Sequence, residues 1–413
     1  MKSVLDALLK RFIYFGSLSV TYSDGTVRQY QGERPGRRAA VRILTAAAER
    51  ALALKPALAF GEEYMNGTVV PDGCSLEDVL WVIIPNVERG GLLSEDISGR
   101  LRYVSRVLRP LNSLKRSRSN VAHHYDLNGS LYELFLDKDR QYSCAYFEHD
   151  GMSLDDAQRA KKRHIAAKLN LNQPGLEVLD IGCGWGGMAL TLARDYGAKV
   201  TGITLSVEQL QVARKRAQDE KLDHLVSFEL LDYRTLKKQF DRIVSVGMFE
   251  HVGVRQYETF FNHIKRLLKP DGVAVIHSIG RMDGPGMTNP WISKYIFPGG
   301  YSPALSETLA ALERTGLWLT DCEVWRLHYA KTLAHWRKRF DGNREKIRAL
   351  YDDRFVRMFE LYLLASELAF RIQGHMNFQL QITRGIEAVP LTRDYMFEAE
   401  NAQREKDRAK TGG

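Results

Sequence analysis

One segment constrains the fold more than any other: VLDIGCGWGG, residues 178–187, where an apolar strand runs into a glycine-rich turn and then a helix. Glycines at 182, 184 and 186 let the backbone approach a ligand closely, and the N-terminus of the following helix favours negative charge. Without a role, each of these glycines would weaken the helix start by up to about 1 kcal/mol. The segment therefore predicts a nucleotide-binding loop.

From about residue 170 onward, short apolar strands alternate with helical segments, which predicts an α/β, Rossmann-like fold with a parallel sheet covered by helices on both faces. The expected strands are 176–182, 199–206, 226–232, 241–248 and 272–280, and the expected helices are 186–196, 207–220 and 257–268. Two later strands, 319–328 and 377–385, flank a long helical region. The Gly/Pro-rich stretch 280–303 is too long for a plain connection, so we expect a functional loop.

The N-terminal segment, residues 1–110, predicts a smaller α+β domain. LSVTYSDGTVRQYQG (18–32) has two alternating strands around a Ser-Asp-Gly turn, and VRILTAAAERALAL (41–54) has the pattern of a short amphipathic helix. A further helix is expected to begin at Ser75. We expect a basic linker at 111–120, a catalytic domain at 121–398 and a flexible tail at 399–413.

Charge and composition limit the cellular setting. The net charge is +9, and residues 97–121 contain no acidic residue but seven basic ones: Arg100, Arg102, Arg106, Arg109, Lys115, Arg116 and Arg118. Such a stripe fits anionic lipid headgroups, nucleic acid or a simple solvated helix face. No apolar run reaches the roughly 20 residues of a membrane span, and the N-terminus does not look like a signal peptide. Four scattered cysteines argue against a disulfide framework, so we expect a cytoplasmic protein.

The glycine loop alone does not choose between NAD and S-adenosylmethionine, because Gly182, Gly184 and Gly187 also fit a dinucleotide fingerprint. A dinucleotide site needs an acidic residue near the end of the second strand, which here ends in Thr204-Leu205-Ser206. Polar groups there and at Gln209 suit S-adenosylmethionine, and Leu231-Asp232-Tyr233 can contact its adenine. An NAD-dependent oxidoreductase and a non-catalytic module for lipid or nucleic acid stay as alternatives.

Eight motifs in order give the chain a resemblance to a known family. They are AHHYDLNGSLYELFLD (122–137), YSCAYF (142–147), VLDIGCGWGG (178–187), GITLSVEQ (202–209), MFEHVG (248–253), IHSIG (276–280), YIFPGG (295–300) and HYAKTLAHW (328–336). With them, residues 121–385 resemble the cyclopropane-fatty-acyl-phospholipid synthases, which include the mycolic-acid cyclopropane synthases and related lipid C-methyltransferases. The resemblance implies a class I methyltransferase fold that uses S-adenosylmethionine together with bound bicarbonate.

The resemblance also implies the roles of individual residues. The cofactor-binding set is Tyr142, Ser143, Gly182, Gly184, Thr204, Leu205, Gln209, Asp232 and Tyr233. The catalytic set, which would hold bicarbonate, is Cys144, Glu250, His277, the backbone of Ile279, and Tyr329. Some family members carry a cysteine in the late helix where this chain has Ser366, so no thiol nucleophile is expected there. The histidines form no metal-ligand pattern, and no metal is expected.

The implied reaction transfers a methyl carbon to the cis double bond of an acyl chain in a membrane phospholipid. It needs alignment, a dry site, and a base that deprotonates the resulting carbocation to close a cyclopropane ring. A methyl-branched or methylene product is the alternative. The apolar helix expected at 352–373 is either core packing or one wall of an acyl channel, with Trp291, Tyr295 and Phe297 at its mouth. We expect peripheral association with the inner face of the membrane and no nucleic-acid partner, and leave a homodimer open.

Overall fold

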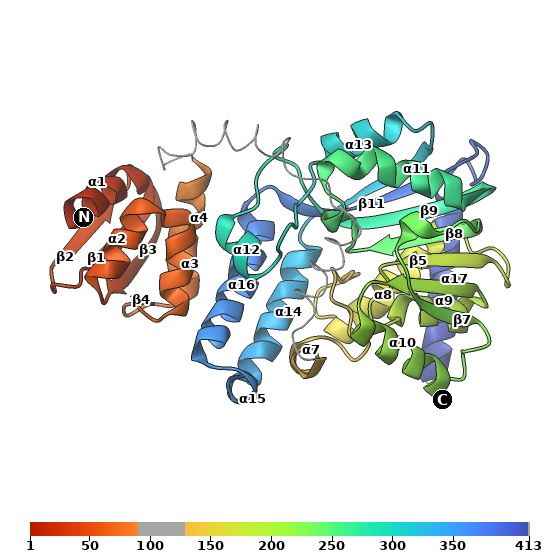
Figure 1. The fold of residues 1–413 in the computed structure, drawn as a ribbon, viewed down its shortest axis with the longest axis horizontal. Helices are drawn as coiled ribbons and strands as arrows, with labels where there is room; N and C mark the ends of the chain where they lie inside the picture. Colours follow the sequence, from red (N-terminus) through yellow and green to blue (C-terminus); the bar gives the residue numbers. More distant parts are fainter. Residues whose placement is uncertain (90–128, 412–413) are drawn as a thin grey trace. The chain divides into compact units, whose positions relative to one another are not determined.

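The computed structural model describes residues 1–89 and 129–411, which fall into two compact units (Figure 1). Of these residues, the N-terminal unit holds 1–89, 286–298 and 333–374, and the Rossmann unit holds 129–285, 299–332 and 375–411. Two segments of the expected catalytic domain over 121–398, residues 286–298 and 333–374, thus pack with the N-terminal residues. The basic linker 111–120 and the basic stripe at 97–121 lie outside the described residues.

The N-terminal unit has a four-stranded sheet in the order β2-β1-β3-β4. Its elements are α1 (Lys2–Phe12), β1 (Phe15–Thr21), β2 (Val27–Gln31), β3 (Arg34–Ile43), α2 (Ala46–Leu54), α3 (Pro56–Met65), β4 (Val69–Pro71) and α4 (Leu76–Glu88). The predicted hairpin is confirmed as β1 and β2. The helix expected from Val41 begins only after Thr45, because Val41 and Ile43 point inward from β3. Ser75 caps α4 as predicted, in a capping box with Asp78.

The same unit also contains aromatic helices from the second half of the chain: α12 (Pro290–Tyr295), most of α14 (His328–Gly342), α15 (Arg344–Leu350) and α16 (Asp353–Ile372). The predicted late helix is thus confirmed as α16, and the long loop contains α12. Trp291 lies directly over Gly61, where a Cβ atom would come within 2.4 Å of the indole. Phe359 stacks on Phe340 with 5.2 Å between ring centroids. These aromatic residues form packed core in this unit.

The Rossmann unit has a seven-stranded sheet in the order β10-β11-β9-β8-β5-β6-β7. The strands are β5 (Glu177–Ile181), β6 (Lys199–Thr204), β7 (Val226–Leu230), β8 (Phe240–Val246), β9 (Leu268–Arg281), β10 (Trp318–Trp325) and β11 (His375–Thr383). The first five run parallel, and β11 is antiparallel to both of its neighbours. The predicted α/β, Rossmann-like class is confirmed, with each expected strand in place.

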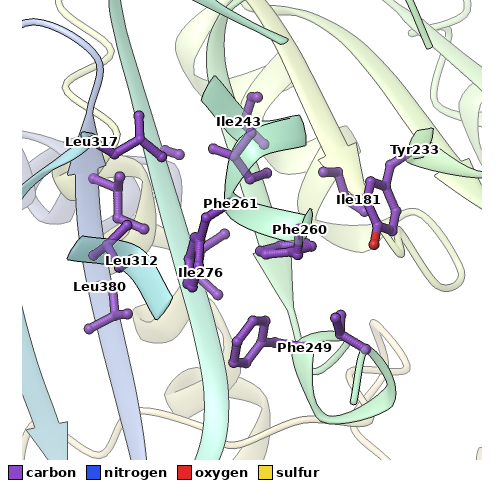
Figure 2. Packing of buried hydrophobic residues seen from close by; sticks show 14 of the residues in the cluster. Ile181, Tyr233, Ile243, Phe249, Phe260, Phe261, Ile276, Leu312, Leu317 and Leu380 are labelled. Atoms are coloured by element: carbon purple, nitrogen blue, oxygen red, sulfur yellow. The ribbon is translucent and has the colours of Figure 1, made fainter. Parts of the chain in front are cut away.

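Helices cover both faces of this sheet. On one face, α11 (Tyr257–Leu267) and α13 (Leu305–Glu313) enclose a core that includes Phe249, Phe260 and Ile276 (Figure 2). On the other face lie α8 (Leu154–Lys168), α9 (Gly187–Tyr196) and α10 (Val207–Asp219). A short helix, α7 (Gly129–Phe135), precedes α8. In the described part of the chain, no helix combines the length and apolarity needed to cross a membrane.

The predicted flexible tail is wrong for residues 399–411, since they belong to α17 (Asp394–Thr411), a helix that packs on α8. The contact is largely ionic, which is why its polar sequence looks like a tail. Arg163 of α8 pairs with Glu148 and with Asp407, each at 3.0 Å. His164 lies between Glu323 at 2.7 Å and Glu400 at 3.1 Å. Buried cations on α8 therefore need the carboxylates that α17 brings.

Candidate active site

A cavity opens beside the carboxyl ends of β5, β6, β7 and β8, where parallel α/β sheets bind their ligands. All nine residues of the predicted cofactor set line it: Tyr142, Ser143, Gly182, Gly184, Thr204, Leu205, Gln209, Asp232 and Tyr233. They come from four separate parts of the sequence. The fold thus brings the whole predicted set to one place.

The glycine loop forms the floor of this cavity. Gly182 and Gly186 have positive φ angles of 79° and 87°, which side chains with a Cβ rarely adopt. A Cβ on Gly186 would also lie 2.7 Å from the ring of Phe228. Gly186 is the N-cap of α9, so the free backbone N–H groups of that helix start behind the loop. The glycines are required by both conformation and packing.

Polar groups at the next two strand ends are held by local hydrogen bonds. The hydroxyl of Thr204 donates to Oε1 of Gln209 at 2.8 Å, which leaves the amide N–H groups of Gln209 available to a ligand. Asp232 accepts two hydrogen bonds from the Arg234 guanidinium, at 2.8 and 2.7 Å. Tyr233 is buried against Phe260, and burial raises its pKa to about 12. These groups have the polarity suited to a nucleoside.

Asp180 is a cavity residue that the sequence analysis left unassigned. It lies one residue before the end of β5 and is 2% exposed, and its Oδ2 atom has no hydrogen-bond partner among the described residues. Burial raises its pKa to about 7. The signal was present in the sequence, as an acidic residue inside an apolar strand. An unsatisfied buried carboxyl in a ligand cavity suits a positively charged ligand group.

The predicted catalytic residues do not line this cavity, but Cys144 and Glu250 adjoin lining residues in the chain. Cys144 follows Ser143 and is fully buried, which raises the pKa of its thiol and keeps it neutral. Glu250 lies between the cavity residues Met248 and His251. Its Oε1 accepts a hydrogen bond from the Ile279 backbone N–H at 2.6 Å, so these two predicted residues contact each other. Its Oε2 has no partner among the described residues, and burial raises its pKa to about 7.

His277 is buried in β9, with its carbonyl accepting from Gly247 at the end of β8. Two amides of β11 contact its ring: Gln379 Nε2 lies 3.1 Å from His277 Nδ1, and Asn377 Nδ2 lies 3.4 Å from His277 Nε2. Burial holds the pKa of His277 well below its usual range, so the ring is neutral. His277 and Ile279 are two residues apart on one strand and therefore share a face of the sheet.

Tyr329 lies in the first turn of α14 and is 7% exposed. That turn holds the segment after Cys144: Thr332 Oγ1 accepts from the Ala145 N–H, and His328 Nδ1 accepts from the Phe147 N–H, each at 3.0 Å. The structure therefore brings Tyr329 and Cys144 into one buried region. Glu250 separately offers a carboxyl group that can hold or release a proton near neutral pH.

Comparison with known proteins identifies the family. The family model described as mycolic acid cyclopropane synthetase matches residues 112–380, and a domain of unknown function matches residues 4–89. The chain is 41% identical to the cyclopropane-fatty-acyl-phospholipid synthase of Escherichia coli K12 over 333 residues, which cover 80% of this chain and 84% of that protein. It is 35% identical to the tuberculostearic acid methyltransferase of Mycobacterium tuberculosis over 391 residues, 91% of this chain and 89% of that one.

Solved structures agree. A mycolic acid cyclopropane synthase bound to S-adenosylhomocysteine and CTAB is 33% identical, with a TM-score of 0.61 over 64% of this chain and 97% of that one. Its ligand confirms S-adenosylmethionine over NAD as the cofactor of this fold. The chain belongs to the mycolic acid cyclopropane synthetase family and is an S-adenosylmethionine-dependent methyltransferase.

Proposed function

We propose that this chain adds a carbon from S-adenosylmethionine to the cis double bond of an unsaturated acyl chain in a membrane phospholipid, and closes a cyclopropane ring. The observation that carries the proposal is the pairing of the cofactor cavity with a buried, proton-accepting region whose residues adjoin cavity-lining residues in the chain. Glu250 supplies that region with a buried carboxyl whose Oε2 has no described partner. Its flanking residues Met248 and His251 line the cavity itself.

The chemistry explains why such a region is needed. When bound, S-adenosylmethionine supplies an electrophilic methyl carbon, and bicarbonate supplies a base near it. The protein has to align the double bond and exclude water, which would trap a carbocation on the acyl chain. Cys144 and His277 are at most 1% exposed. Ring closure requires loss of one proton, and a carboxyl with a pKa of about 7 can share that proton with a small oxyanion.

The residues present fit bicarbonate in charge and polarity. The Cys144 thiol and the Tyr329 hydroxyl are neutral donors, and Glu250 accepts a hydroxyl proton when it is ionised. The Ile279 N–H already donates to Glu250, so bicarbonate would share or displace that hydrogen bond. Activity measured after rigorous removal of carbon dioxide, and again after bicarbonate is restored, tests the assignment. Full activity without bicarbonate would remove it from the proposal.

The product is tested with isotopically labelled S-adenosylmethionine and vesicles of unsaturated phospholipid, followed by mass spectrometry of the acyl chains. We expect a gain of one methylene unit with loss of the double bond. Glu250→Gln serves as the control for activity at this site. A labelled product that keeps a double bond, or carries a saturated methyl branch, would contradict ring closure.

A methyl-branched or methylene fatty acyl product is the second candidate. The relative that covers the largest share of this chain among those compared above, 91%, is named a tuberculostearic acid methyltransferase rather than a cyclopropane synthase. The two reactions share the carbocation and diverge only in its fate. The mass-spectrometric experiment above separates them directly.

The proposal places the enzyme at the inner membrane face, bound peripherally to its phospholipid substrate, with a homodimer as its assembly. Flotation with anionic and neutral vesicles over a salt series tests the first point. Sedimentation of the full chain tests the second. Failure to float with either vesicle at low salt would contradict membrane-surface binding, and a monomer at micromolar concentration would contradict the dimer.

A further inference from the structure

Lys161 is a buried cation that the reaction described so far does not use. It lies on α8 with no exposed surface. Its ammonium donates to Gln141 Oε1 and to Ser143 Oγ, both at 2.8 Å. Among the described residues, no carboxylate lies within ion-pair distance of it, whereas Lys168 on the same helix pairs with Asp321 at 3.2 Å. Its ammonium is thus hydrogen-bonded only to neutral oxygens, while the carboxylates of Asp137 and Asp139 act on it from beyond ion-pair distance.

The direction of its hydrogen bonds shows how Lys161 orients a residue of the cofactor cavity. An ammonium can only donate, so Ser143 Oγ accepts from Lys161 and its own hydroxyl proton points elsewhere. Ser143 is fixed further by Gln158, whose Nε2 donates to the Ser143 carbonyl at 2.9 Å. Because Ser143 lines the cofactor cavity, its proton is available there. Lys161 thus makes Ser143 a hydrogen-bond donor backed by a positive charge.

The same cavity presents the opposite charge from another strand. Asp180 lines it with a carboxyl oxygen that lacks a described partner. The amino acid end of S-adenosylmethionine carries both an ammonium and a carboxylate. Asp180 suits the ammonium, and Ser143 suits the carboxylate. Burial lowers the pKa of Lys161 only to about 8, so it is mostly charged at neutral pH.

We propose that Lys161 is a positioning residue that recognises the carboxylate of S-adenosylmethionine through the Ser143 hydroxyl. The proposal deepens the proposed function, because it rests on the cofactor assigned there. The proposal predicts that the effect of Lys161 on binding depends on whether the ligand has the carboxylate. A ligand with the carboxylate gains from Lys161, and one without it does not.

The test compares two ligands in the full chain by calorimetry: S-adenosylhomocysteine, and its decarboxylated analogue, which keeps the amine. Lys161→Met is expected to weaken S-adenosylhomocysteine binding roughly tenfold to a hundredfold, as for a hydrogen bond to a charged group. Binding of the decarboxylated analogue should change less than about threefold. Ser143→Ala should show the same selectivity, and the double variant should be little worse than either single one, because both act through one contact.

The controls separate this role from a structural one. Methionine keeps the length of the lysine stem and removes an unpaired buried charge, so the unfolding midpoint of Lys161→Met should not fall. Lys168→Met leaves Asp321 and Glu323 without their shared cation, so it should lower the midpoint without ligand selectivity. If Lys161→Met does not fold, Lys161→Gln takes its place in the same comparison of the two ligands.

Three results would overturn the proposal: equal loss of affinity for both ligands, unchanged affinity for S-adenosylhomocysteine, or a changed bicarbonate requirement at unchanged S-adenosylhomocysteine affinity. The third would assign Lys161 to the other anion. If the native chain binds neither nucleoside ligand, the proposed function itself fails, a result that the native titration reveals before any variant is compared.

Discussion

Asp180 offers a sharp test of the electrostatics of the cavity. Its pKa rises from 3.8 to about 7 because its carboxyl is buried. Since one pKa unit corresponds to about 1.4 kcal/mol, keeping Asp180 ionised in the ligand-free fold costs roughly 4 kcal/mol. Asp180→Asn removes that cost while keeping the shape of the side chain. The variant should therefore be more stable than the native chain at every pH at which Asp180 of the native chain is ionised.

The sign follows from the direction of the pKa change. Because folding raises the pKa, the unfolded chain releases this proton first as the pH rises. Stability from neutral Asp180 is complete below about pH 4 and is lost progressively up to about pH 7. The stabilisation by Asp180→Asn should accordingly be roughly 2–3 kcal/mol larger at pH 8 than at pH 5. Urea unfolding of the ligand-free native and variant chains at both values measures this difference.

Folding favours the neutral form of Asp180, whereas cofactor binding should favour its ionised form. If the ligand ammonium needs ionised Asp180, the native affinity for S-adenosylhomocysteine should rise about tenfold from pH 6 to pH 8. Asp180→Asn should bind more weakly, without that rise. Glu250→Gln is the matched control, because Glu250 has a similar pKa but does not line the cavity, and it should keep the rise. In the unfolding experiment, a result in which Asp180→Asn destabilises the ligand-free chain equally at pH 5 and pH 8 would show that Asp180 is paired. Our reasoning about its electrostatics would then be wrong.

Three further predictions concern the proposed chemistry and the fold. Glu250→Gln should lower turnover about a hundredfold or more, and Tyr329→Phe should lower it about tenfold. Calorimetry should show that both variants keep their affinity for S-adenosylhomocysteine within about threefold of the native value. Loss of cofactor binding by Glu250→Gln would contradict the role assigned to Glu250. Ser366→Ala should leave initial rates within about twofold, and a loss of two orders of magnitude would show that this hydroxyl takes part. Truncation after Arg393 removes α17, and with it the Asp407 partner of Arg163 and the Glu400 partner of His164, so the thermal unfolding midpoint should fall by roughly 5–10 °C. An unchanged midpoint would show that α17 adds no stability.

Much of the Rossmann unit could be predicted because its pattern is local. Each parallel strand is a short apolar run, and the glycine loop marks one strand end without reference to the rest of the chain. Once the strand order is known, residues at neighbouring strand ends meet at one edge. For this reason Thr204 and Tyr233, which are far apart in sequence, could be placed in one cavity with Gly182.

The failures have a common physical cause, which is burial of polar groups through distant partners. Lys161 and His164 look like surface residues in the sequence, and only contacts from other elements show that they are buried. The same holds for α17, whose polar residues resemble a loose tail. The division into units was also missed, because no local pattern shows that Trp291 packs over Gly61.

The order of the strands has a consequence for synthesis of the chain. β11 lies between β9 and β10, yet it is made after both. Ninety-three residues separate Arg281 from His375, so translation at roughly 5–20 residues per second leaves one edge of β9 unpaired for about 5–20 seconds. That edge belongs to a strand with the apolar run Val273–Ile276. During this interval the nascent protein exposes a template for intermolecular pairing, which makes chaperone supply and growth temperature strong determinants of soluble yield.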